Sequence, residues 1–118
     1  MEEGERVRRE VLGDAHVDAA IDPFSADFYA LITRYAWGKI WGRDGLDRRT
    51  RSAITLAVLA TLRAEAELAL HVRAALRSGL SSDEIKEVLL QVAVYAGVPA
   101  ANTAFAVAAR VLREESDA

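Results

Sequence analysis

The sequence predicts an all-α protein, a bundle of about six helices, from three observations. Helix-start and helix-stop signals recur along the 118 residues. Apolar residues between these signals follow helical spacing. No segment shows the apolar–polar alternation of a half-buried strand, and no internal repeat is present. We expect one domain over residues 1–118, because this length suits a single hydrophobic core.

Two helices are expected in the N-terminal part of the chain. A charged helix over residues 2–12 ends at a glycine, and residues 14–18 follow as a loop. The pair Asp22–Pro23 opens the second helix, because aspartate is a good N-cap and proline suits the first helical position. This helix runs to about residue 38. Residues 39–45 then continue into a loop with two glycines.

Four further helices follow, each marked by local signals. Asp47 is the expected cap of the first, and Gly79 and Gly97 end the second and third. Ser81 and Glu84 fit a capping box, since each side chain can bind the other residue's backbone N–H. The expected helices cover residues 48–62, 64–78, 82–96 and 99–115.

Composition excludes several classes of function. Apolar residues make up 52%, largely alanine, which favours close helix approach and often needs a partner subunit to complete the core. A net charge of −3 argues against nucleic acid as a main partner. The absence of cysteine removes disulfides, thiolate metal sites and thiol redox chemistry. The N-terminus is polar, and no apolar run approaches the about 20 residues of a membrane span, so we expect a cytoplasmic protein without a membrane partner.

Candidates for proton transfer are few, because the chain has only two histidines. Glu67 and His71 are spaced i and i+4, which places both side chains on one side of a helix. A helical wheel places His71 at the edge of an apolar stripe and Glu67 just beyond it. His71 is therefore either a proton donor oriented by Glu67 or a structural histidine at a helix seam, beside a solvated glutamate.

Most of the chain resembles the carboxymuconolactone decarboxylase family. The resemblance is carried by residues 67–79 and 84–105 and, in the first half, by residues 7–18, 33–38, 40–41 and 50–52. It implies an alkyl hydroperoxidase D-like helical fold, a homo-oligomer (hexamer or trimer) and no cofactor. Redox relatives use a Cys-x-x-Cys pair before a histidine. Ala64 and Glu67 stand at those positions here, with His71 as the histidine, so peroxide reduction by that route is excluded.

The activity that the resemblance implies is decarboxylation of 4-carboxymuconolactone, a small dicarboxylate lactone, to β-ketoadipate enol-lactone. The protein must then supply cations for a dianion, a donor to the lactone oxygen and one acid. His71 is the leading acid, with Glu67 orienting it. His16 is either a second acid or substrate contact, or a capping residue of its loop. Arg51 and Arg34 bind the substrate carboxylates, or form ion pairs at a surface or interface.

Aromatic side chains complete the expected site. Trp37 and Trp41, with Tyr35, either wall the pocket or anchor an oligomer. Tyr95 is a candidate donor to the lactone oxygen. Glu67, His71 and His16 could in principle bind zinc, but we expect no metal, because the Glu67–His71 spacing occurs often by chance and no second spaced motif supports it. The alternative function is a protein of the same fold that acts on a related lactone, or a non-catalytic oligomeric binding protein.

Overall fold

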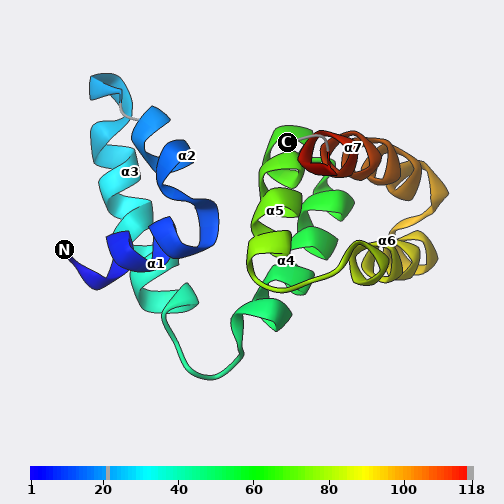
Figure 1. Ribbon diagram of the computed structural model, residues 1–118, viewed down its shortest axis with the longest axis horizontal. Coiled ribbons are helices and arrows are strands. Elements are labelled where there is room, and N and C mark those ends of the chain that lie inside the picture. Colours follow the sequence, from blue (N-terminus) through cyan, green and yellow to red (C-terminus); the bar gives the residue numbers. More distant parts are fainter. Residues whose placement is uncertain (21, 117–118) are drawn as a thin grey trace. The chain divides into compact units, whose positions relative to one another are not determined.

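A computed structural model describes residues 1–20 and 22–116, and every regular element in them is helical. This confirms the predicted all-α class. The backbone forms two compact units, residues 1–48 and 49–118, which are coloured blue to cyan and green to red in Figure 1. One domain over residues 1–118 stays a prediction. No helix in the described chain is long and apolar enough to cross a membrane.

The first unit begins with two α-helices and continues through a nearly unbroken helical stretch. Its elements are α1 (Glu3–Leu12), α2 (Asp14–Ala19), the 3₁₀ turn η1 (Pro23–Ser25), α3 (Ala26–Ile32) and the π-helix η2 (Thr33–Trp41). The predicted start at Asp22–Pro23 is confirmed, since the Asp22 carboxylate accepts a hydrogen bond from the Phe24 N–H at 2.9 Å. Gly13 ends α1 with a φ of 91°, as predicted.

The loop predicted for residues 14–18 is wrong, because this stretch forms α2. The physical reason is Arg9 on α1. Its guanidinium donates to Asp14 at 3.0 Å and to Asp18 at 2.9 Å, and these hydrogen bonds raise its pKa. The two aspartates are spaced i and i+4, so a helix presents both on one face to the same guanidinium. A contact with another helix therefore overrides a weak local propensity.

The crossing of α1 and η2 is close because glycines meet there. A Cβ added at Gly4 would overlap the backbone oxygen of Thr33, and one added at Gly38 would lie 3.5 Å from the Gly4 Cα. α1 packs along η2 over this crossing. Since Arg8 lies one helical turn after Gly4, the crossing also brings Arg8 against α3, where it lies over the Tyr29 ring.

The wide turns of η2 are a feature that no sequence pattern predicted. A π-helix bonds each N–H to the carbonyl five residues earlier, is rare, and is frequent at functional sites. Its last turns carry Trp37 and Trp41, whose ring centroids lie 5.0 Å apart. Trp37 is buried and Trp41 is half-buried.

The second unit is built from four helices around one apolar core. They are α4 (Arg48–Leu62), α5 (Glu65–Arg77), α6 (Ser82–Ala96) and α7 (Val98–Ser116). These bounds match the predicted helices to within about two residues. The fully buried core side chains include Leu56, Leu68, Val72, Ile85, Leu89 and Val111. The capping role of Asp47 stays a prediction.

The predicted capping box at the start of α6 is confirmed. The Ser81 Oγ accepts from the Glu84 N–H at 3.1 Å, and Glu84 accepts from the Ser81 N–H at 2.9 Å. Arg49 binds the same Glu84 carboxylate and donates to the Gly79 carbonyl at 3.3 Å. The hydrogen bond from Ser81, followed by that from Arg49, lowers the pKa of Glu84. Through Arg49, the capping box is therefore connected to α4.

Substituting Ser81→Ala is expected to lower the free energy of unfolding by about 1 kcal/mol, because the Glu84 N–H then loses its cap. Urea denaturation followed by far-ultraviolet circular dichroism measures this change. Ser82→Ala is the matched control, since Ser82 is exposed and lies just inside the helix. It should change stability by less than about 0.5 kcal/mol. Equal losses in both variants would contradict the capping role.

Candidate functional site

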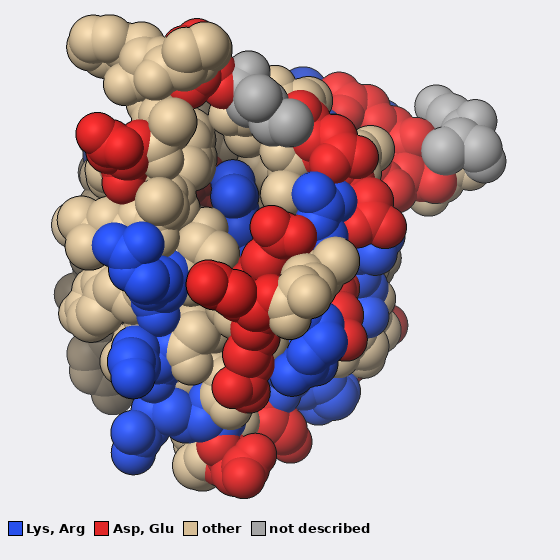
Figure 2. Space-filling view, turned by 90° about the vertical axis from the view of Figure 1, so that its left-hand side faces the viewer, with Lys and Arg blue, Asp and Glu red and all other residues tan. Residues whose placement is uncertain are grey.

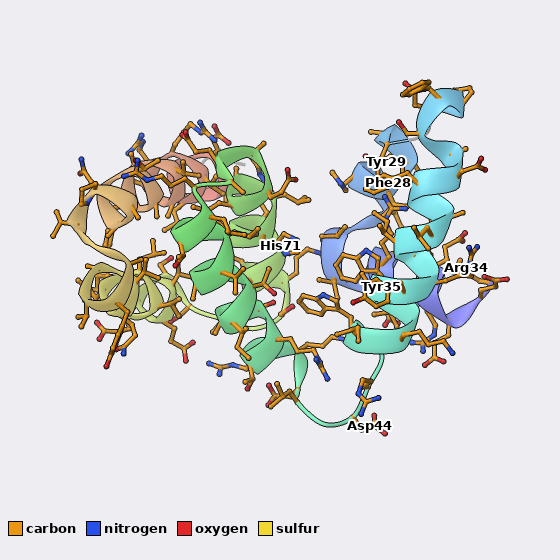
Figure 3. The ribbon with its side chains drawn as sticks, turned by 180° about the vertical axis from the view of Figure 1, so that it is seen from behind. Phe28, Tyr29, Arg34, Tyr35, Asp44 and His71 are labelled. Atoms are coloured by element: carbon orange, nitrogen blue, oxygen red, sulfur yellow. The ribbon has the colours of Figure 1, made fainter. Side chains whose placement is uncertain are left out.

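The pair predicted for proton transfer lies on α5. Leu68 and Val72 are buried on the inner face of this helix, whereas His71 is half-buried and Glu67 is exposed. The predicted edge position of His71 is therefore confirmed. Figure 3 shows His71 projecting from α5. On the opposite side of the helix, Arg73 pairs with Glu114 of α7 at 2.9 Å. The edge of α5 that carries His71 is therefore partly exposed, and the opposite edge carries an exposed ion pair to α7.

Arg51 lies near the start of α4 and is half-buried. Its backbone carbonyl accepts from the Thr55 hydroxyl at 2.8 Å. The neighbouring Ser52 is 2% exposed, and its hydroxyl makes no hydrogen bond within the described residues. A buried hydroxyl without a partner is unusual, and sequence reasoning missed it. Arg49, two residues earlier on the same helix, binds Glu84.

Tyr95 lies on α6 and is 82% exposed. It borders a cavity of about 240 Å³ between α4 and α6 whose walls are mainly apolar. The lining residues are Ala57, Thr61, Gln91, Val92, Tyr95 and Ala96. His71 is not one of them, so this cavity does not bring the predicted oxyanion donor together with the predicted acid.

The other predicted polar residues lie in the first unit. His16 is exposed on α2, and its neighbours Asp14 and Asp18 both bind Arg9. Arg34 is exposed on η2 (Figure 3) and borders a cavity of about 280 Å³. The lining of this cavity is Glu2, Glu5, Arg8, Tyr29, Ala30, Thr33 and Arg34.

Of the three aromatic side chains predicted to cluster, the structure brings together only the two tryptophans. Trp37 and Trp41 contact each other with their ring planes tilted by 31°. Tyr35 is 63% exposed and contacts neither ring within the described residues. The cluster is thus a tryptophan pair, with Tyr35 on the outside of the helix.

The sequence analysis did not single out Arg8, which is buried although arginine is usually exposed. Its side chain borders a cavity of about 310 Å³, and the residue is only 7% exposed. The guanidinium carbon lies 5.0 Å from the centre of the Tyr29 ring, a cation–π distance. The remaining lining residues are Glu5, Arg9, Val17, Ala20, Asp22, Pro23, Ala26 and Thr33. A buried arginine in a mainly apolar cavity is the strongest single polar feature of this unit.

The charges around Arg8 are already engaged elsewhere. Arg9 pairs with Asp14 and Asp18, and Asp22 caps η1. Arg8 has no carboxylate within ion-pair distance in the described chain, and its Nε makes no hydrogen bond there. Burial lowers its pKa, although the nearby Tyr29 opposes that effect. Arginines at the surface lie in a different environment from Arg8. On the face shown in Figure 2, basic and acidic groups lie side by side.

The predicted site residues are thus divided between the two units. His16, Arg34, Trp37 and Trp41 belong to residues 1–48, and Arg51, Glu67, His71 and Tyr95 belong to residues 49–118. Within residues 1–20 and 22–116, no group of three His, Asp or Glu side chains is placed to hold a metal ion. The only signal for Arg8 in the sequence was its place in the N-terminal motif, which also contains Arg9 and His16.

Comparison with known proteins agrees with this helical architecture. The family model "Carboxymuconolactone decarboxylase family" matches residues 26–110. The 4-carboxymuconolactone decarboxylase of Acinetobacter baylyi is 44% identical over 95% of this chain and 86% of its own. The nitrosuccinic acid decarboxylase of Metarhizium robertsii is 40% identical over 98% and 83%, respectively. An uncharacterized 15.0 kDa protein of Paracoccus denitrificans is 35% identical over 69% and 62%. The chain belongs to the carboxymuconolactone decarboxylase family.

Proposed function

We propose that this protein decarboxylates 4-carboxymuconolactone to β-ketoadipate enol-lactone. The observation that carries the proposal is 44% identity with the Acinetobacter baylyi enzyme over 95% of this chain. A match of that extent includes both compact units and is not confined to the helices that the wider family shares. The proposal includes a homo-oligomer, a hexamer or trimer, in the cytoplasm. Exposed apolar side chains, such as Phe24 on η1 and Phe28 on α3, support self-association.

The proposed reaction needs no cofactor, because the substrate accepts its own electrons. The lactone carbon that loses CO₂ also carries a CH₂–COO⁻ arm. When its C–COO⁻ bond breaks, the electron pair moves through the ring double bond to the lactone carbonyl and forms a dienolate. One proton then adds at the carbon next to that carbonyl, which gives the enol-lactone. The protein must orient the dianion, stabilise the developing oxyanion and deliver that proton.

Each of these tasks has a candidate side chain. We assign the proton to His71, whose half-buried position on α5 limits its contact with water. Glu67, one turn earlier, would orient it. Arg51 and Arg34 are the candidate cations for the substrate carboxylates. Trp37 and Trp41 offer an apolar wall, which would favour the change from a carboxylate to neutral CO₂.

Tyr95 and His16 have weaker structural support. Tyr95 is largely exposed in its groove, so a role as oxyanion donor would require that a further surface cover it. His16 is exposed on α2. It stays a candidate substrate contact. A role as the cap of a loop is excluded, because residues 14–18 belong to α2.

A second candidate substrate is nitrosuccinate, because the Metarhizium robertsii relative is 40% identical over 98% of this chain. The chemistry is parallel. The carbon of nitrosuccinate that bears the nitro group carries both a carboxylate and a CH₂–COO⁻ arm. Loss of CO₂ moves an electron pair into the nitro group, and protonation of the resulting nitronate gives 3-nitropropanoate. The two substrates therefore share the leaving carboxylate and the retained arm, and they differ in the electron acceptor.

Incubating the purified protein separately with 4-carboxymuconolactone and with nitrosuccinate tests the proposal. We expect CO₂ and enol-lactone from the lactone, at a rate well above the reaction without protein and with the higher kcat/KM of the two. A higher kcat/KM for nitrosuccinate would favour the second candidate. Turnover of neither compound would contradict both and would leave the non-catalytic alternative.

A further inference from the structure

We propose that the cavity around Arg8 binds a carboxylate on a short apolar stem. The ligand identity rests on the proposed function: in that reaction, the bound group is the CH₂–COO⁻ arm that the substrate retains. The cavity has a volume of about 310 Å³ and lies within the first unit, between α1, α2 and α3. It was not among the predicted sites, which placed the substrate carboxylates on Arg51 and Arg34.

The first argument is that Arg8 is committed to no other carboxylate. Neighbouring arginines are paired: Arg9 binds Asp14 and Asp18, and Arg6 binds Glu10 at 3.2 Å. Arg8 is more deeply buried than either, at 7% exposed, yet its Nε makes no hydrogen bond in the described chain. Its guanidinium lies over the face of Tyr29, a contact that uses none of its N–H groups as hydrogen-bond donors to a carboxylate.

The second argument concerns energy. Arginine stays protonated in proteins, so Arg8 carries its charge into this cavity, where the Glu5 carboxylate attracts it without forming an ion pair. A buried charge without a partner is strongly destabilising, and buried charges are normally paired. The close crossing at Gly4 nevertheless holds the helix so that Arg8 lies over Tyr29. A ligand that brings the missing negative charge would remove this penalty.

The third argument selects the class of anion. A guanidinium fork matches the two oxygens of a carboxylate. Glu5 and Asp22 also line the cavity, and their negative charges disfavour an anion of higher charge such as phosphate. The walls formed by Val17, Pro23 and Ala26 suit an apolar stem. A single carboxylate on a methylene group satisfies all three conditions.

A binding experiment tests the site without turnover. The probe is 2-furylacetate, which combines a flat five-membered ring with a CH₂–COO⁻ arm, and its uncharged control is 2-furylacetamide. The variants are Arg8→Met and, as a matched control on the same helix, Arg6→Met. We expect the wild type and Arg6→Met to bind the acid with the same Kd by calorimetry. Arg8→Met should bind it at least about tenfold more weakly, and the amide should bind weakly to all three.

A stability measurement separates a binding role from a structural one. If the role of Arg8 is to bind a ligand, Arg8→Met should fold. Its Tm without ligand should then equal or exceed that of the wild type, because the substitution removes an unpaired buried charge. Adding 2-furylacetate should then raise the Tm of the wild type more than that of Arg8→Met. Should Arg8→Met not fold, Arg8→Lys replaces it in the binding comparison only: it keeps the charge and loses the fork, so it should still bind the acid more weakly than the wild type.

Three results would overturn the proposal. The first is an equal Kd of wild type and Arg8→Met for the acid. The second is equal affinity of the wild type for acid and amide. The third is no binding together with a change of oligomeric state in Arg8→Met, which would place a carboxylate of a second copy of this chain on Arg8. Absence of lactone turnover with intact, Arg8-dependent binding of 2-furylacetate would contradict the proposed reaction and leave the carboxylate site supported.

Discussion

Replacing His71 by alanine is expected to lower kcat for 4-carboxymuconolactone by about 10²- to 10⁴-fold, the usual contribution of a positioned acid. The physical reason is that the dienolate formed on loss of CO₂ must receive a proton at one carbon, and His71 is the proposed donor. Its half-buried position on α5 places it beside apolar Leu68 and Val72 without removing it from the surface. Steady-state rates of enol-lactone formation measure the effect.

Two controls separate proton delivery from a structural role of His71. His16→Ala removes the other histidine, an exposed candidate for a substrate contact, and should therefore affect KM more than kcat. Imidazole added to His71→Ala should restore part of kcat if the missing group is an acid, and should have no effect if the helix seam has collapsed. Turnover of His71→Ala near the wild-type rate would exclude His71 as the donor and move the assignment to another group.

The edge position of His71 could be predicted because it follows from the apolar periodicity of one helix. The spacing of Leu68, Val72 and Ala75 defines the buried stripe of α5, and all three are fully or almost fully buried. Every residue in that argument lies within a few turns of His71, so helical periodicity was sufficient. The same holds for the capping box, where Ser81 and Glu84 are three positions apart and exchange hydrogen bonds locally.

The environment of Arg8 could not be predicted in this way. Its cavity takes walls from α1, α2 and α3, and Arg9 on α1 binds two aspartates of α2. Helical periodicity indicates which face of α1 is apolar, but it does not show that a charged residue on that face is buried. Arginine is rarely buried, so composition favoured an exposed Arg8. The division into two units likewise depends on contacts between distant segments.

The second large effect is expected at Gly4, where Gly4→Ala should lower the stability of the first unit by about 1–3 kcal/mol. Helix propensity alone predicts the opposite sign, since alanine is favoured over glycine by about 1 kcal/mol inside a helix. The reversal arises because the added Cβ would overlap the Thr33 carbonyl oxygen, a backbone atom that cannot rotate away. Urea denaturation followed by tryptophan fluorescence reports on this unit, because both tryptophans of the chain, Trp37 and Trp41, lie on η2.

Gly45→Ala is the matched control, because no atom lies within 4 Å of a Cβ added at Gly45. Its stability should change by less than about 0.5 kcal/mol. If Gly4→Ala were neutral or stabilising, α1 and η2 would move apart without a loss of stability. The crossing would then not fix the position of Arg8. If it destabilises as expected, the variant should also bind 2-furylacetate more weakly than Gly45→Ala does. The added Cβ would push α1 away from η2, and Arg8, one turn later, would move off the Tyr29 ring. The same close crossing would then govern both the stability of the unit and the geometry of its carboxylate site.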